Sequence, residues 1–250
     1  MTLPLETMHK RYLQQADWTA DLRKDLFEHA NFNEAKRVLE VGSGTGAVIG
    51  TLPIAKGRIS HGLDIHFLSL KYSHKQNSDA EHTGGDAHSL PYADNSFDFV
   101  FCHFVLLWLD DPLTALSEMS RVTRSDGFVI SFAEPDYGGR IDHPPELKPL
   151  GKWQADALEA QGADSEMGRK VLGLFQQSGL KEVQSGVLGA QWSEANADDS
   201  EREWQILKTD LEGRISAEQL EIFAREEKRA TKSGNRVLYV PTFFALGRPK

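Results

Sequence analysis

Three glycines at alternate positions, Gly42, Gly44 and Gly46, follow directly after Val38–Val41, a stretch that is apolar except for Glu40. A near-continuous apolar run is typical of a buried parallel strand. Glycines just after such a strand let the backbone turn tightly and approach a ligand, because no Cβ stands in the way. The G-x-G-x-G spacing differs from the G-x-G-x-x-G fingerprint of dinucleotide sites. It favours a ligand that lies across the loop and carries no pyrophosphate.

Two aspartates follow further along the same predicted sheet. Asp64 ends a second predicted strand, about 20 residues beyond the glycines, where Rossmann-like folds place an acid against ribose hydroxyls. A carboxylate accepts two hydrogen bonds at once, so it can hold a vicinal diol. Asp86 lies in the segment Gly85–Pro91, and a third apolar run, Phe97–His103, comes next. The order of these features predicts a nucleotide-binding α/β sheet.

With these motifs in place, the chain resembles the class I S-adenosylmethionine-dependent methyltransferases, and among them the small-molecule branch that includes the quinone C-methyltransferases. The resemblance covers residues 35–135 and keeps the motifs in order. They are Glu40–Gly46, Asp64, Gly85–Ala87 with Leu90 and Pro91, Ser96–Asp98, and Arg121 and Val122 before Asp126 and Gly127. The chain departs from the family where Val105–Leu109 replaces the usual Leu-His-His-Leu signature. Because two polar groups are missing there, the resemblance does not identify the methyl acceptor.

The resemblance implies S-adenosyl-L-methionine as the methyl donor, S-adenosyl-L-homocysteine as the product, and no metal ion. It puts the glycine loop under the methionyl part, Asp64 at the ribose and Asp86 near the adenine amine. The implied cofactor-binding residues are Glu40, Gly42, Ser43, Gly44, Gly46, Asp64, Ile65, Asp86, Ala87, Cys102 and His103. Alternatives remain open for two of them: a helix-capping or salt-bridge role for Glu40, and an Asx turn for Asp86.

The reaction expected from the resemblance is an SN2 attack on the methyl carbon of a sulfonium. The catalytic candidates His103, Glu134 and Tyr137 follow predicted strands four and five, where doubly wound sheets hold their ligand crevice. A histidine works as a general base near neutral pH. His103 could equally be a hydrogen-bonded supporting residue. Cys102 is expected to be a small buried hydrophobe rather than a nucleophile.

A cover over the methyl group is predicted from residues 8–24 and the loop Glu134–His143. The substrate and lid candidates are Tyr12, Trp18, Arg23, Asp136 and His143, with a plain packed helix as the alternative for residues 18–23. An aromatic substrate wall is a further possibility, with core packing favoured over it. Its candidate members are Trp192, Trp204, Tyr239 and Phe243.

The predicted fold is α/β, a Rossmann-like doubly wound seven-stranded sheet that is mostly parallel, with an antiparallel last strand and helical cap elements. We expect one methyltransferase domain over residues 1–250. Its parts are an N-terminal helical cap at 1–34, a cofactor-binding core at 35–135, and helical substrate-side insertions at 136–180 and 193–233. Helices are predicted at 6–30, 45–53, 67–76, 112–123, 146–161, 165–178, 197–211 and 217–231, and late strands at 181–192 and 235–246.

Composition limits the partners. The net charge of −9 argues against a nucleic-acid substrate, which requires a basic patch. A single cysteine fits a reducing cytosol, no apolar run approaches the roughly 18 residues that span a bilayer, and the charged N-terminus shows no signal peptide. We therefore expect a cytoplasmic enzyme without a membrane partner, acting on an O, N or activated C of a small organic acceptor. The oligomeric state stays open.

Three rival functions remain. A protein or RNA methyltransferase is the first, although no basic stripe and no Asn-Pro-Pro-Tyr type tetrapeptide is present. An NAD(P)-dependent oxidoreductase is the second, disfavoured by the glycine spacing and by Asp86 with Ala87. A cofactor-binding protein without catalysis is the third, and only an activity assay separates it from an enzyme.

Overall fold

A seven-stranded sheet in the order β3-β2-β1-β4-β5-β9-β7 forms the centre of the computed structural model, which describes residues 4–77, 79–189 and 197–250. The strands are β1 Arg37–Val41, β2 Ile59–Asp64, β3 Glu81–Gly84, β4 Phe97–Cys102, β5 Thr123–Pro135, β7 Lys181–Val187 and β9 Thr242–Arg248. All pairs are parallel except those of β9, which is antiparallel to both β5 and β7. The predicted doubly wound sheet with an antiparallel last strand is confirmed.

Strands β1 and β4 lie at the middle of the sheet, where the chain order reverses. Val38, Leu39, Val100 and Phe101 are fully buried there, as expected for strands covered on both faces. In open α/β sheets the ligand crevice forms beyond the carboxyl ends of the strands at such a reversal. The topology therefore directs attention to the residues that follow β1 and β4.

Helices cover both faces and the carboxyl edge of the sheet. They are α1 Leu5–Trp18, α2 Ala20–His29, α3 Phe67–Gln76, α4 Pro112–Val122, α5 Lys148–Glu159, α6 Met167–Gln177, α7 Ala197–Leu211 and α8 Ala217–Lys232. Local sequence explains two of the starts. Asp111 accepts a hydrogen bond from the Thr114 amide with Pro112 at the first position of α4, and Ser216 with Gln219 forms a capping box on α8.

Two of the predicted helices differ from the structure. The predicted helix at 45–53 is wrong: turns lead only to a short 3-10 segment, Ile49–Thr51. Gly46 has a φ of +79°, and Asn77 reaches across it to bond its carbonyl, so this stretch cannot continue as a helix. The predicted helix at 6–30 is two helices, broken at Thr19.

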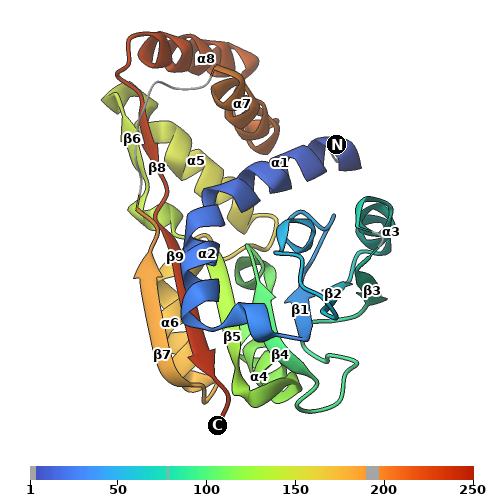
Figure 1. Ribbon diagram of the computed structural model, residues 1–250. Helices are drawn as coiled ribbons and strands as arrows, with labels where there is room; N and C mark the ends of the chain where they lie inside the picture. The colour runs from blue at the N-terminus through green and yellow to red at the C-terminus, as the bar shows by residue number, and fades with distance from the viewer. Residues whose placement is uncertain (1–3, 78, 190–196) are drawn as a thin grey trace.

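The predicted strand at 235–246 is divided as well. Its first part, β8 (Val237–Tyr239), pairs antiparallel with β6 (Ile141–His143) in a separate two-stranded sheet, and Pro241 lies between β8 and β9. Proline has no N–H to give to a ladder, which explains the break. Figure 1 shows β6 and β8 extending beyond the main sheet, with α7 and α8 at that end.

Two helical layers cap the carboxyl edge. The blue helix α1 in Figure 1 runs across the carboxyl ends of the parallel strands and lies beside α7. Helices α1 and α2 pack into one side of the core through Ala16, Leu26 and Phe27. Helices α5, α7 and α8 share a smaller apolar cluster that includes Leu150 and Leu211. None of the described helices is long and apolar enough to cross a bilayer.

Candidate active site

The glycine loop between β1 and the 3-10 turn has three residues in the left-handed region, with φ of +70° at Gly42, +50° at Gly44 and +79° at Gly46. A Cβ at Gly42 would lie 2.5 Å from a methyl of Val105, and one at Gly46 would lie 2.1 Å from Ser73 Oγ. Internal packing thus requires these two glycines. A Cβ at Gly44 would meet only an aromatic ring of α1 at 3.8 Å, so Gly44 is the glycine whose bare Cα faces the cap.

Asp64 lies at the end of β2, directly against this loop. Its Oδ2 accepts a hydrogen bond from the Gly44 amide at 2.7 Å, and its Oδ1 accepts one from the His66 amide at 2.8 Å. A carboxylate oxygen has lone pairs for more than one donor. Next to this fixed carboxylate, Ile65 is 68% exposed, unusual for an isoleucine that follows a buried strand. Asp64 and Ile65 together suit a ligand that has a vicinal diol and a flat apolar ring.

Glu40 and Ser43 lie beneath the loop rather than on it. Glu40 is buried, accepts a hydrogen bond from the Ile49 amide at 2.8 Å, and has its pKa raised to about 8 by burial. It therefore supports the 3-10 turn, which matches the capping alternative. The hydroxyl of Ser43 is buried against Gly62 of β2, with no hydrogen-bond partner among the described residues.

Asp86 forms a local turn at the far end of the candidate crevice. Its Oδ1 accepts the His88 amide at 2.9 Å and lies 2.7 Å from His88 Nδ1, and these bonds lower the pKa of Asp86. The arrangement is that of an Asx turn, the alternative left open from the sequence. Ala87 beside it is buried.

Cys102 ends β4 and His103 follows it, and the two side chains differ in environment. Cys102 is completely buried, and burial raises the pKa of its thiol, so it is a core residue. His103 is half-buried, and its Nε2 lies 3.0 Å from Thr19 Oγ1 at the α1–α2 break. Burial and the nearby Arg23 guanidinium lower the pKa of His103 to about 3. The imidazole is therefore neutral at physiological pH.

Helix α1 covers the glycine loop with two further side chains. His9 Nδ1 lies 2.9 Å from Thr45 Oγ1, and the ring of Tyr12 is the group that faces Gly44. Burial, and then the charge of Asp64, raise the pKa of Tyr12. The lid candidate Trp18 instead is about half exposed, with the Arg11 guanidinium 4.7 Å above its ring.

The sequence analysis missed His9, and it considered Thr19 only as part of the predicted lid, with Trp18 and Arg23. His9 and Thr19 lie on α1 and at its end with Tyr12, at positions i, i+3 and i+10, which share one helical face. This spacing of polar side chains was the signal that could have identified them. Arg23, one helical turn beyond Thr19, is nearly buried and donates to Thr19 Oγ1.

Glu134 is an interior residue rather than a residue of the crevice surface. It is completely buried at the end of β5, and it accepts hydrogen bonds from the amides of Val105 at 3.1 Å, Leu106 at 2.9 Å and Leu107 at 3.1 Å. Burial raises the pKa of Glu134 to about 7, against the effect of these bonds. The carboxyl group thus fixes the segment that follows His103.

The remaining acceptor-side candidates point elsewhere. Asp136 is buried in a two-bond ion pair with Arg169 of α6, at 2.6 and 2.7 Å. His143 belongs to β6, where its Nε2 lies 3.2 Å from Asn235 Oδ1. The structure does not bring these two side chains to the glycine loop. Of the aromatic-wall candidates, Trp204 packs with α5 and α8, and Trp192 lies outside the described residues.

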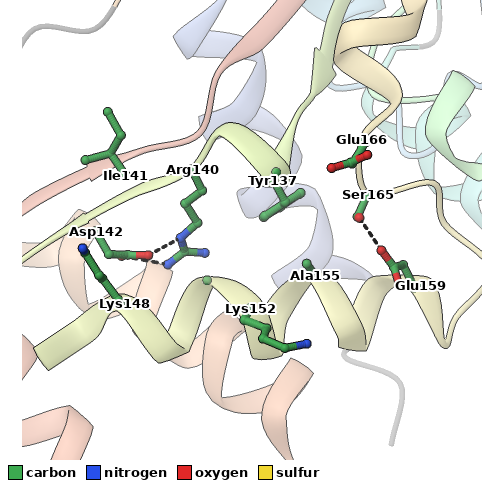
Figure 2. Close-up of a pocket in the computed structure, with 12 residues that line it drawn as sticks. Tyr137, Arg140, Ile141, Asp142, Lys148, Lys152, Ala155, Glu159, Ser165 and Glu166 are labelled. Atoms are coloured by element: carbon green, nitrogen blue, oxygen red, sulfur yellow. Dashed lines mark hydrogen bonds and ion pairs between the residues drawn. The ribbon is translucent and has the colours of Figure 1, made fainter. Parts of the chain in front are cut away.

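Tyr137 lines a cavity of about 630 Å³ on the outer side of α5. Figure 2 shows this cavity, with Tyr137 and Arg140 on one wall and Lys148 and Lys152 on α5. Neither the glycine loop nor Asp64 nor His103 contributes to its lining. His103, Glu134 and Tyr137 therefore occupy three separate environments and do not form a catalytic triad.

The two groups of residues that do come together are the Gly44–Asp64 pair and the His103–Thr19–Arg23 cluster. Gly44 follows β1, Asp64 ends β2 and His103 follows β4, so both groups lie at the carboxyl edge of the sheet, beside the point where the strand order reverses. The exposed Ile65 and the ring of Tyr12 lie next to the Gly44–Asp64 pair. The first group offers a fixed carboxylate and an unobstructed glycine backbone, the kinds of group that bind a nucleoside.

Comparison with known proteins agrees with this geometry. Residues 39–131 match the family described as a methyltransferase domain. The chain is 39% identical over 106 residues to the demethylmenaquinone methyltransferase of Renibacterium salmoninarum, covering 41% of this chain and 44% of that protein. It is 31% identical over 121 residues to the malonyl-[acyl-carrier protein] O-methyltransferase of Erwinia pyrifoliae, covering 48% and 46%.

Among solved structures, the Haemonchus contortus phosphoethanolamine N-methyltransferase 2 in complex with S-adenosyl-L-methionine aligns with a TM-score of 0.57 at 17% identity. The alignment covers 86% of this chain and 49% of that one. This likeness shows the fold alone. The chain spans about half the length of the curated relatives it matches. Their methyl acceptors are therefore not assigned to this chain.

Proposed function

We propose that this chain, which carries a class I S-adenosylmethionine-dependent methyltransferase domain, transfers a methyl group by an SN2 reaction to a small organic acceptor. The observation that carries the proposal is Asp64, whose carboxylate is fixed by the Gly44 amide at the end of β2. That geometry suits the two ribose hydroxyls of the methyl donor, beside the exposed apolar surface of Ile65.

The residues that would hold the methyl donor extend along the carboxyl edge of the sheet. Gly44 would lie under its methionyl part, Asp64 at the ribose, and Ile65 with Ala87 at the adenine. Asp86 remains a candidate for the adenine amine, because only one of its oxygens is committed to His88. The donor brings an already activated methyl group to the site.

The protein's own task is to align the acceptor and exclude water. Alignment of reacting groups can supply about 7–11 kcal/mol of an activation barrier. Helix α1 covers the glycine loop through His9 and Tyr12, so it suits the water-excluding role. Glu134 acts as a positioning residue in this proposal, because it fixes the backbone after His103 rather than facing the crevice.

The acceptor class is an O, N or activated C nucleophile on a small molecule. The two curated relatives named above differ in their printed acceptors, a demethylmenaquinone and a malonyl-[acyl-carrier protein], so similarity does not choose between them. The net charge of −9 supports an acceptor other than a nucleic acid, and the single cysteine supports a cytoplasmic location. A protein or RNA acceptor and a catalytically silent binding protein are the alternatives.

A methyl-transfer screen tests the proposal. The protein is incubated with S-adenosylmethionine and panels of phenols, quinones, amines, small carboxylic acids, protein and RNA, and products are read by mass gain. We expect one methyl added to a small molecule, with one equivalent of S-adenosylhomocysteine. Methylation of the protein or RNA panel alone would replace the small-molecule assignment, and cofactor binding without any transfer would favour the silent alternative.

A further inference from the structure

The hydrogen-bond partners of Thr19 determine which nitrogen of His103 carries a proton. Thr19 is completely buried at the end of α1, and its hydroxyl makes three contacts. Oγ1 lies 3.0 Å from the carbonyl oxygen of Ala16, accepts a bond from Arg23 Nη1, and lies 3.0 Å from His103 Nε2. A hydroxyl has one proton to donate and two lone pairs to accept with.

The carbonyl oxygen of Ala16 can only accept, and it also accepts from Arg23 Nη1. Because two oxygen acceptors 3.0 Å apart would repel each other, the hydroxyl proton of Thr19 lies between Thr19 Oγ1 and the Ala16 carbonyl. The guanidinium of Arg23 can only donate, so it takes one lone pair of the hydroxyl oxygen. The remaining lone pair faces His103, and the contact is a hydrogen bond only if Nε2 carries a hydrogen. This assignment satisfies every group in the cluster and leaves Nδ1 as the unprotonated ring nitrogen of His103.

The charge of Arg23 keeps the imidazole of His103 neutral. Arg23 is only 6% exposed and approaches from α2, and its charge together with burial lowers the pKa of His103. Thr19 from the α1–α2 break and the edge-on ring of Phe104 are the other groups packed on the imidazole, and neither is charged. Glu40 of β1 acts on Arg23 rather than on His103. A second proton on the ring would place two cations side by side in a buried cluster.

We propose that Thr19 and Arg23 are positioning residues that hold His103 neutral with its proton on Nε2, so that Nδ1 accepts a hydrogen bond from the nucleophilic O–H or N–H of the methyl acceptor. This inference rests on the proposed function and narrows its acceptor class to hydroxyl compounds and neutral amines. A carbon nucleophile without such a donor would gain nothing from Nδ1.

The step balances without a further reagent. The acceptor's heteroatom lone pair forms the new bond to the methyl carbon as the carbon–sulfur bond breaks, and that electron pair stays on sulfur. The acceptor's proton stays on its heteroatom, hydrogen-bonded to Nδ1, during the attack and passes to water afterwards. A neutral imidazole with a low pKa is a weak base, so Nδ1 orients the donor and does not itself become protonated.

Nitrogen-15 NMR of the histidine rings in the ligand-free protein tests the assignment without any turnover. His103→Gln identifies the His103 signals among the nine histidines. We expect a protonated Nε2, an unprotonated Nδ1, and no titration between about pH 5 and 8, whereas an ordinary histidine titrates near 6.5. A proton on Nδ1, or a titration near the ordinary value, would overturn the proposal.

Three variants separate positioning from simple structural support. Thr19→Val removes the hydroxyl, and we expect mixed ring tautomers and a kcat lower by about tenfold, at an unchanged Kd for S-adenosylhomocysteine. Thr19→Ser should restore both readouts. Thr51→Val is the matched control, because Thr51 accepts from Arg23 Nη2 at 3.3 Å without touching His103.

The outcomes distinguish this inference from the proposed function. Failure of the protein to bind S-adenosylmethionine would end the proposed function, whatever the ring spectrum. Normal cofactor binding and turnover, with wild-type ring signals in Thr19→Val, would overturn the role of Thr19 alone. The same holds if Thr51→Val shifts the ring signals as strongly as Thr19→Val does.

Discussion

The carboxyl edge of the sheet and the helical cap beyond β5 are held together by different interactions. At the edge, a carboxylate meets backbone amides of a neighbouring loop, as Asp64 does with Gly44. In the cap, charged side chains meet each other across long stretches of chain. Asp142 of β6 receives Arg140 at 2.7 Å and Arg236 at 2.9 Å, and all three are nearly buried. We propose that the first arrangement presents groups to a ligand, while the second joins β6 to the C-terminal segment.

This difference predicts that cofactor affinity and cap stability respond to separate substitutions. The largest effect is expected from Asp142→Asn, which removes the carboxylate partner of the buried Arg140 and leaves Arg236 with Glu227 alone. Removing one member of a buried ion pair costs about 3–5 kcal/mol. Urea unfolding should show that loss, while the affinity for S-adenosylhomocysteine of the folded fraction stays unchanged.

The control for this variant is Asp156→Asn, which breaks the exposed pair of Lys152 and Asp156 on α5. Exposed pairs contribute about 0–1 kcal/mol. If both variants unfold at the same urea concentration, the buried cluster is not what stabilises the cap.

The second prediction concerns the edge. Asp64→Ala removes the carboxylate expected to hold the ribose, and bonds to charged groups are worth about 1.5–3 kcal/mol each, so cofactor affinity should fall more than about tenfold. Asp98→Ala is the matched control, since Asp98 also accepts two backbone amides, from Lys36 and Arg37, but at the opposite end of β1. Calorimetry that finds equal dissociation constants for folded Asp64→Ala and wild type would place the ribose elsewhere.

A third prediction separates the two halves of the expected cover. Helix α1 touches the glycine loop through His9 and Tyr12, whereas the segment 134–143 is fixed by the Asp136–Arg169 pair and lies apart from the loop. Hydrogen exchange should therefore show protection gained in α1 when S-adenosylhomocysteine binds. Equal gains in both segments would restore the joint lid expected from the sequence, and no gain in α1 would make it packing only.

The smallest effect is the pH dependence of stability that Glu134 contributes above about pH 6.5. The folded-state pKa of Glu134 is about 7, above the ordinary 4.5, so the folded protein holds more protons than the unfolded chain between these values. Stability is therefore lost as pH rises toward and through 7, by up to about 1.4 kcal/mol per pH unit. The pKa of Glu40 is about 8, so this residue extends the loss of stability to higher pH.

Melting temperatures between about pH 6.5 and 8 check this, because His103 is neutral in both the folded and most of the unfolded protein there. Glu134→Gln should reduce the slope near pH 6.5 to 7 and leave the part of the slope that comes from Glu40. An identical slope in wild type and variant would mean that Glu134 is ionised throughout this range.

The motifs around β1, β2 and β4 could be recognised from the sequence because each is local. A strand, its turn and its acidic residue are neighbours in the chain, so the sequence predicts that Gly44 and Asp64 lie at one edge of the sheet, and the structure confirms this. The predicted helix at 45–53 failed because Asn77, more than twenty residues away, packs onto Gly46 and bonds its carbonyl. Composition alone could not reveal that contact.

The acceptor side was less predictable for the same reason. Glu134, Asp136 and His143 lie at or after the end of β5, where ligands commonly bind. Their partners nevertheless lie on the segment Val105–Leu107, on α6 and at Asn235. Whether such a side chain faces the crevice or the interior depends on elements that the local sequence does not specify. Thr19 is the opposite case, because the local sequence does not predict its contact with His103. The two residues are 84 positions apart in the chain.

Calorimetric titration of the wild-type protein with S-adenosylmethionine, S-adenosylhomocysteine and NADH tests the central claim most directly. We expect micromolar binding of S-adenosylmethionine and S-adenosylhomocysteine and negligible binding of NADH. The expectation follows from the G-x-G-x-G loop, the Asp64 carboxylate and the helix α1 that covers the loop. Tight binding of NADH without binding of S-adenosylmethionine would contradict the account and assign the crevice to a dinucleotide.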